Sequence, residues 1–484
     1  MPLYMPVPLL LATSMHAAAG LVINALTLTN TQREILKDDK VKLIFQNYLS
    51  NLPVSLKEKL LYYILDLDEL EASVRYRALL LILCPQMKSL CPGIFPQTYF
   101  TRVAHVICCQ GTTLESLDLR GVWLKGNLLG ELQNILQSLK NLRDLHIPHM
   151  ATDAILNTIG QYNTSLQILD IMGECNVTEA GIESLCNSGN SVITHNLQFV
   201  LLGNPGGDEV SPSTVSLLIK YLPKLQSLGS YPKVGEAIEY LIQENSDITT
   251  NLIHLHDSYT DLNRICILIK TTPMLDSIFI DHPSDGVISH LCEFSHLTKV
   301  KFQRFQLNEF FRFINKVGRK LLTMELMFGS GILDFASLSK QCPNLVKFTC
   351  YKMDCIRHFD KVEFPYLKNF GVYYSDISPS CVKSVMLASP NMEKLSLGDF
   401  LEITDDDIIE IFTTKEFTKL KHIWFANAVY LTSVSVQILI ECCPNLVSLG
   451  ELSGWNMTQT ETIIFKEAIE TENLALKIID YFND

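Results

Sequence analysis

The chain has 484 residues, of which 47% are apolar and 19% are charged, and its formal net charge is −13. This length exceeds what one compact core usually holds, so the chain contains either several domains or a repeat array. The composition excludes a disordered chain, and the acidic balance argues against nucleic acid or an anionic membrane as the main partner.

Residues 1–40 form an apolar N-terminal segment, to which the sequence assigns no role. No Lys or Arg precedes its apolar run, so the start differs from a secretory signal peptide. No apolar stretch reaches the roughly 18–20 residues needed to cross a membrane without polar interruption. The 14 Cys show no disulfide-framework spacing, which favours free thiols in a reducing compartment. We therefore expect a cytoplasmic protein, with the nucleus as an alternative.

Residues 41–110 are predicted to be a helical N-terminal region. Its clearest part reads NLPVSLKEKLLYYILDL, from Asn51 to Leu67. Pro53 suits the start of a helix, and apolar residues follow it at helical spacing. A second helix is predicted at about 70–83, after a short acidic turn.

From residue 114 onward the chain repeats the phrase L-x-x-L-x-L. Neighbouring copies are separated by 22 residues (Leu275 to Leu297) to 31 residues (Leu166 to Leu197). The last four positions alternate in polarity, as a short strand with one buried face requires, and a turn and a helical pattern follow. Fourteen copies begin at Leu114, Leu142, Leu166, Leu197, Leu225, Leu252, Leu275, Leu297, Leu321, Leu345, Leu367, Met392, Leu420 and Leu446.

A strand, turn and helix of this length cannot close a core alone, so neighbouring units must stack. The repeat resembles the leucine-rich repeat family over roughly residues 110–470. The motifs CPNL (342–345 and 443–446) and the loop EITDDD, followed by a helix, are similar to the cysteine-containing repeats of F-box/leucine-rich-repeat proteins.

The resemblance implies an α/β fold: a leucine-rich repeat solenoid, or horseshoe, with a parallel sheet on the concave face and helices on the convex face. We assign the repeats to residues 111–470. Residues 471–484 are expected to be a C-terminal cap, with the last amphipathic helix running through TETIIFKEAIETENLALKIIDYF.

The segment ahead of the repeats has three interpretations. It resembles an F-box, in which Leu-Pro, an apolar helix, Leu-Asp and another helix follow one another; the matching residues are Leu52, Pro53, Leu56, Ile64, Leu67, Asp68 and Leu70. Residues 55–64 also resemble an elongin-binding box, with Leu60 in place of its Cys. The third interpretation is a helical cap that shields the first repeat. The resemblances imply Leu52, Pro53, Leu56, Leu60 and Ile64 as adaptor-binding residues.

The polar positions of each strand point into the concavity, since side chains alternate along a strand. Aromatic side chains at these positions are suited to protein binding. We select Phe279, Tyr351, Tyr373 and Trp424 as the residues that contact a protein target.

No catalytic residue, cofactor or metal site is expected. His254 and His256 share one strand face, but a third ligand is missing; Cys350, Cys355 and His358 lack a second ligand pair. The acidic run 405–407 fits the first turn of a helix.

We therefore expect a non-catalytic protein-interaction protein. The family resemblance implies a substrate-recognition subunit of a cullin-type ubiquitin ligase, with a Skp-type or elongin-type adaptor and cullin as partners, acting in ubiquitin-dependent protein degradation. The alternative is a leucine-rich repeat scaffold without a ligase link.

Overall fold

The computed structural model describes residues 10–31, 49, 51–67, 69–163, 165–174, 176–187, 196–204, 210–244, 248–358, 360–398 and 401–480. Asp68 of the F-box-like outline and parts of the predicted segments 1–40, 41–110 and 471–484 therefore lie outside the described residues. The chain divides into two compact units. We call Pro8–Leu255 the N-terminal unit and His256–Asp484 the C-terminal unit.

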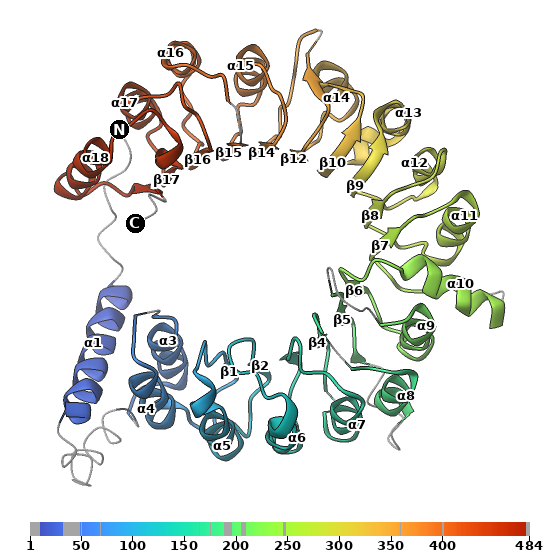
Figure 1. Cartoon of the computed structure of the whole chain (residues 1–484), viewed down its shortest axis with the longest axis vertical. Helices are drawn as coiled ribbons and strands as arrows, with labels where there is room; N and C mark the ends of the chain where they lie inside the picture. The colour runs from blue at the N-terminus through green and yellow to red at the C-terminus, as the bar shows by residue number, and fades with distance from the viewer. Residues whose placement is uncertain are drawn as a thin grey trace. The chain divides into compact units, whose positions relative to one another are not determined.

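The described strands form two main parallel sheets (Figure 1). The first has six described strands, all in the N-terminal unit: β1 (Ser89–Leu90), β2 (Ser116–Asp118), β3 (Asp144–His146), β4 (Ile168–Asp170), β5 (Phe199–Leu202) and β6 (Ser227–Gly229). The second has ten described strands: β7 (His254–Ser258), β8 (Ser277–Asp281), β9 (Lys299–Gln306), β10 (Thr323–Ser330), β12 (Lys347–Tyr351), β14 (Asn369–Tyr373), β15 (Lys394–Gly398), β16 (His422–Phe425), β17 (Ser448–Gly450) and β18 (Lys477–Ile478). Two short strands, β11 (Ile332–Asp334) and β13 (Cys355–Arg357), pair in parallel and form a separate small sheet. In the chain, β11 follows β10 and β13 follows β12.

Within each unit the helices lie outside the strands (Figure 1). The N-terminal unit contains α1 (Leu10–Thr31), α3 (Val54–Leu65), α4 (Ala72–Ile82), α5 (Phe100–Gln110), α6 (Leu129–Ser138), α7 (Asp153–Tyr162), α8 (Glu179–Asn187), α9 (Pro212–Tyr221) and α10 (Val234–Glu244). The C-terminal unit contains α11 (Leu262–Thr271), α12 (Val287–His290), α13 (Leu307–Val317), α14 (Phe335–Gln341), α15 (Pro379–Ala388), α16 (Asp405–Thr414), α17 (Ser433–Cys442) and α18 (Gln459–Thr471). Among the helices so described, none is long and apolar enough to cross a membrane.

The predicted repeat is confirmed, and with it the α/β leucine-rich repeat fold. Each of the fourteen phrases begins two residues before a described strand, from Leu114 ahead of β2 to Leu446 ahead of β17. The apolar positions of the phrase point into the core, as Leu345, Phe348 and Cys350 illustrate, each at most 1% exposed. Neighbouring repeats therefore share one continuous core, because no single repeat could bury these side chains alone.

Two described strands lie outside the interval 111–470 that the sequence predicted for the repeats. β1 pairs with β2, and β18 pairs with β17. The expected last helix is wrong beyond Thr471, where α18 ends. Leu474, Leu476 and Ile478 are buried at alternate positions, which is the period of a strand rather than of a helix. Residues 477–478 thus extend the sheet by one strand.

Asparagine side chains join several repeats to the repeat before them. In the P-N-L motif, the amide Nδ2 of Asn344 donates to the carbonyl of Arg319 at 2.8 Å, and Asn445 donates to Thr418 at 2.5 Å. Asn163 makes a buried version of this contact: its Nδ2 donates to the carbonyls of Leu136 and Leu139 at 3.1 and 2.7 Å. These carbonyls belong to the end of the previous helix, α6, where helices leave such groups unpaired.

Replacing Asn163 with Ala should lower the free energy of unfolding by about 1–3 kcal/mol, because two carbonyls lose their donor in a site that is fully buried. Chemical denaturation followed by circular dichroism measures the change. Gln161→Ala, an exposed position two residues earlier, serves as the control and should change stability by less than about 0.5 kcal/mol. Equal effects of the two substitutions would contradict this role of Asn163.

Candidate functional site

The helices α3 and α4 pack against each other at the start of the N-terminal unit. Their apolar faces are largely buried within the chain's own core: Leu60 is 2% exposed and Ile64 is 0% exposed. Of the other predicted adaptor-binding residues, Leu52 and Leu56 are half-buried and Pro53, directly ahead of α3, is exposed. The described surface thus offers a partner the N-terminal end of α3, but not Leu60 or Ile64.

The helix α1 lies against α3 and α4 (Figure 1). Its residues Ala19, Val22 and Leu26 are buried. The imidazole Nδ1 of His16 lies 2.7 Å from the hydroxyl of Tyr63, and an Nη1 of Arg77 donates to the carbonyl of Leu26 at 3.2 Å. α1 therefore covers part of the helix pair with both apolar and polar contacts.

The sheet face of the N-terminal unit carries a polar cluster. Arg120 forms a bidentate ion pair with Asp118 on β2, with a closest distance of 2.6 Å. On the next two strands, the Nδ1 of His146 lies 3.0 Å from an Oδ2 of Asp170. The hydrogen bond to Asp170 raises the pKa of His146, although partial burial opposes its protonation. Burial likewise opposes the ionisation of Asp170, but the hydrogen bonds from His146 and from the Met172 amide outweigh it, so its pKa is lowered.

The sheet face of the C-terminal unit carries the four aromatic residues predicted to bind a target, and all four are half-buried. Tyr351 and Tyr373 are direct neighbours on β12 and β14, and the rings of Tyr373 and Trp424 lie 5.9 Å apart. Phe279 does not join them, because β9 and β10 separate its strand from β12. Its ring stacks on His256 at 3.9 Å, and the Nζ of Lys301 lies 4.6 Å from the ring centre.

Two glycines hold these rings close to the sheet. A Cβ at Gly371 or at Gly398 would lie 3.0 Å from the ring of Tyr373, and a Cβ at Gly398 would lie 3.3 Å from the ring of Trp424. The rings therefore occupy the space that side chains at these two positions would fill. Packing against backbone fixes their orientation and leaves little conformational entropy to lose on binding.

Two further aromatic residues, Phe328 and Tyr374, extend this group. Phe328 lies 5.5 Å and Tyr374 lies 4.8 Å from the ring of Tyr351. Phe328 lies within β10 and Tyr374 directly follows β14, and both have a positive φ, 51° and 50°, a left-handed conformation that is uncommon for bulky residues. No local sequence signal distinguishes them, because a positive φ is expected mainly of Gly and Asn. We call Phe328, Tyr351, Tyr373, Tyr374 and Trp424 the aromatic platform.

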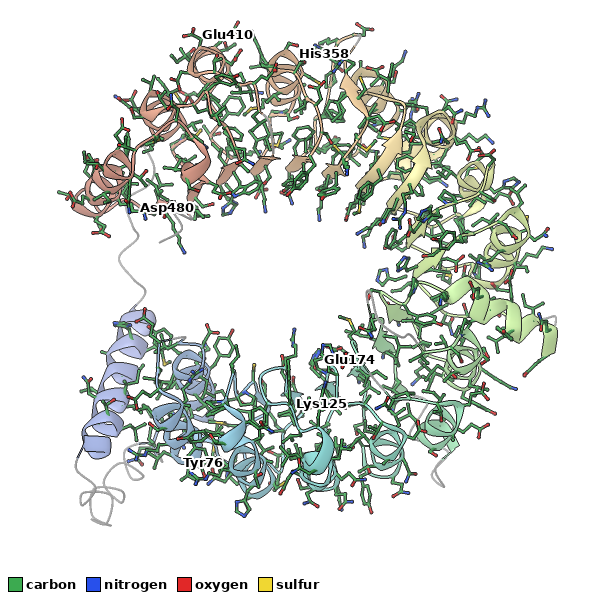
Figure 2. The ribbon with its side chains drawn as sticks, in the orientation of Figure 1. Tyr76, Lys125, Glu174, His358, Glu410 and Asp480 are labelled. Atoms are coloured by element: carbon green, nitrogen blue, oxygen red, sulfur yellow. The ribbon has the colours of Figure 1, made fainter. Side chains whose placement is uncertain are left out.

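Within the described ranges, no three His, Cys, Asp or Glu side chains are arranged to hold a metal ion. His358 contacts the hydroxyl of Ser384 at 3.2 Å and lies on the helix side of its unit (Figure 2). The acidic run 405–407 forms the first turn of α16, as predicted. Asp407 completes a capping box with Thr404.

None of the described cysteines forms a disulfide. Cys186, Cys342 and Cys381 are buried, and burial raises the pKa of each thiol to about 12. Such thiols stay protonated at neutral pH, so they act as small apolar side chains rather than as nucleophiles.

Comparisons with known proteins give similar solved structures but no match by sequence. No family model matches the chain, and no curated protein matches it. Among solved structures, the chain is similar to a yeast protein chain in the crystal structure of the Rad7 and Elc1 complex. The sequence identity is 14%, the match covers 95% of this chain and 97% of that chain, and the TM-score is 0.47.

The pair of His146 and Asp170 predicts a pH dependence of stability. The folded-state pKa of His146 lies above its ordinary value of 6.5, so the stabilisation is fully present below about pH 6.5 and is lost as the pH rises through the folded-state pKa. The denaturation midpoint should therefore fall more between pH 6 and pH 9 in the native chain than in His146→Gln. Parallel pH profiles of the two proteins would contradict the prediction.

Proposed function

We propose that the chain is a non-catalytic protein-binding subunit that holds a protein target on the aromatic platform. The supporting observation is the platform itself: five aromatic side chains gathered on one sheet face, with Tyr374 57% exposed and Tyr373 packed over two glycines. Rigid aromatic rings supply large contact areas at small entropic cost, and they are enriched among the residues that dominate protein interfaces.

We further propose that the chain presents its target to a cullin-type ubiquitin ligase, in the cytoplasm or the nucleus. The order of its parts supports this role, since an F-box-like helix pair precedes the repeats. The N-terminal end of α3, with Leu52, Pro53 and Leu56, is the part of that pair that a Skp-type or an elongin-type adaptor could contact.

The second candidate function is a scaffold without a ligase link. The burial of Leu60 and Ile64 favours it, because these side chains serve the chain's own core instead of an adaptor. In that case α3 and α4 act only as the cap that a repeat array needs at its end.

Removing two platform rings should weaken target binding strongly. The intact chain and Tyr373→Ala/Trp424→Ala are used to capture proteins from cell extract, with quantitative mass spectrometry as the readout. At least one captured protein should fall by roughly 30-fold, as expected for the loss of about 2 kcal/mol at a binding hot spot. Tyr366→Ala/Tyr430→Ala is the matched control, since both tyrosines are exposed away from the strands. Equal capture by all three proteins would contradict binding at the platform.

The ligase link is tested with Leu52→Asp/Leu56→Asp, which adds charge to the accessible end of α3. The intact chain should recover an adaptor and a cullin, and the variant should recover neither, because a buried unpaired carboxylate is costly at an interface. Ile463→Asp/Ile464→Asp on α18 is the matched control, with both side chains about half exposed. Recovery of a Skp-type adaptor would support the F-box resemblance, and recovery of an elongin-type adaptor would support the elongin-binding-box resemblance. If no adaptor is recovered with the intact chain, the scaffold function holds.

A further inference from the structure

A row of positive charge crosses the sheet face of the C-terminal unit. The strand register aligns the third position of each repeat, and this row contains the four lysines Lys299, Lys347, Lys394 and Lys477 together with the polar side chain of His422. The remaining members, from β8 to β17, are Ser, Thr and Asn, so the row contains no carboxylate. This arrangement is unexpected in a chain whose net charge is −13.

The central lysines of this row are available to a partner. Lys347 and Lys394 are exposed, and no described residue forms an ion pair with either of them. Lys299, by contrast, lies 2.9 Å from Asp276. The pKa of His422 is lowered by its partial burial and by the charges of Lys394 and Lys421, which is consistent with a positive local potential.

The carboxylates near the row are already paired within the chain. Glu325 lies 2.7 Å from Lys301, and Asp281 lies 2.6 Å from Arg304. Glu393 lies 3.0 Å from both Lys368 and Lys421. Each of these carboxylates has a cationic partner within the chain, whereas Lys347 and Lys394 have no ion-pair partner among the described residues.

The row and the aromatic platform share one face of the same strands. Lys347 and Tyr351 are both on β12, four residues apart, so their side chains point to the same side. Lys394 on β15 and Trp424 on β16 are two positions out of register, which makes them near neighbours. A segment that follows the row can therefore place an apolar side chain on the platform.

The spacing of the lysines fits an extended peptide. Lys299, Lys347 and Lys394 lie on alternate strands of the sheet, so their backbones are about 10 Å apart. An extended segment in the polyproline II conformation advances about 3.1 Å per residue with three residues per turn, so carboxylates three residues apart point to the same side and lie about 9 Å apart, which matches this spacing.

We infer that the C-terminal sheet face binds an extended acidic protein segment, with Asp or Glu at every third position on the lysine row and an apolar side chain on the aromatic platform. This inference rests on the proposed function and specifies the chemistry of the target. A protein segment is favoured over nucleic acid, because nucleic-acid-binding domains usually carry a net positive charge, whereas this chain is acidic.

The test uses the full chain and a phage library of random 12-residue peptides. Selected peptides should be enriched in Asp or Glu at positions i, i+3 and i+6 and should contain an aromatic or aliphatic residue beside them. The affinity of a fluorescein-labelled selected peptide is then measured by anisotropy. Lys347→Glu/Lys394→Glu should weaken binding by roughly tenfold or more, since like charges then face each other. Lys270→Glu/Lys340→Glu, with the same charge change on the exposed helix side, should stay within about twofold of the intact chain.

Each other outcome overturns the inference. Selected peptides that lack the acidic pattern but lose binding in Tyr373→Ala/Trp424→Ala would leave the proposed function standing and remove the lysine row from it. Acidic peptides bound equally by Lys347→Glu/Lys394→Glu would place their site elsewhere. Binding of a labelled dT20 oligonucleotide that is lost in the lysine variant would assign the row to nucleic acid. If no peptide is selected, the inference fails, while the proposed function is decided by the capture experiment with the platform variant.

Discussion

The apolar side chains at the first, fourth and sixth positions of each repeat are buried only by the neighbouring repeats. A single strand, turn and helix cannot enclose them, so every repeat depends on the one before it and the one after it. Neighbouring repeats are also joined by hydrogen bonds, both between their parallel strands and from asparagine side chains to carbonyl groups of the preceding repeat. The same stacking aligns the polar positions of successive strands, as the register of β12, β14, β15 and β16 shows.

Residues at the same position of successive repeats therefore lie next to one another on the sheet face. In the N-terminal unit the rows bring together Asp118, Arg120, His146 and Asp170, which form a charged and internally paired cluster. In the C-terminal unit they bring together tyrosine rings, glycines and lysines. The glycines contribute to this surface, because a Cβ at Gly371 or Gly398 would lie only 3.0 Å from the ring of Tyr373. Each surface is thus a property of several repeats and of no single one.

Under the proposed function, the N-terminal helices have two separate roles. The first strand of the array needs an apolar cover; α3 contacts β1, and α4 and α1 pack on α3, with Leu60, Ile64 and Val22 among the buried side chains. A docking surface for an adaptor needs accessible apolar groups instead, which leaves the N-terminal end of α3 around Pro53 and Leu56. In α3 the two roles would therefore fall on different residues: Leu60 and Ile64 belong to the core, and the N-terminal end of the helix stays accessible.

The repeat, its strands and its capped helices can be predicted from the sequence, because period, polarity and turn chemistry are local properties of the chain. The sequence also placed Phe279, Tyr351, Tyr373 and Trp424 on the polar positions of their strands. It did not reveal β1 and β18, whose phrases are degraded, or the end of α18 at Thr471. Only the tertiary structure decided which aromatic rings share a surface, since the strands beside each ring come from residues 22 or more positions away along the chain. Phe279 is separated from the other three rings and Phe328 joins them for that reason.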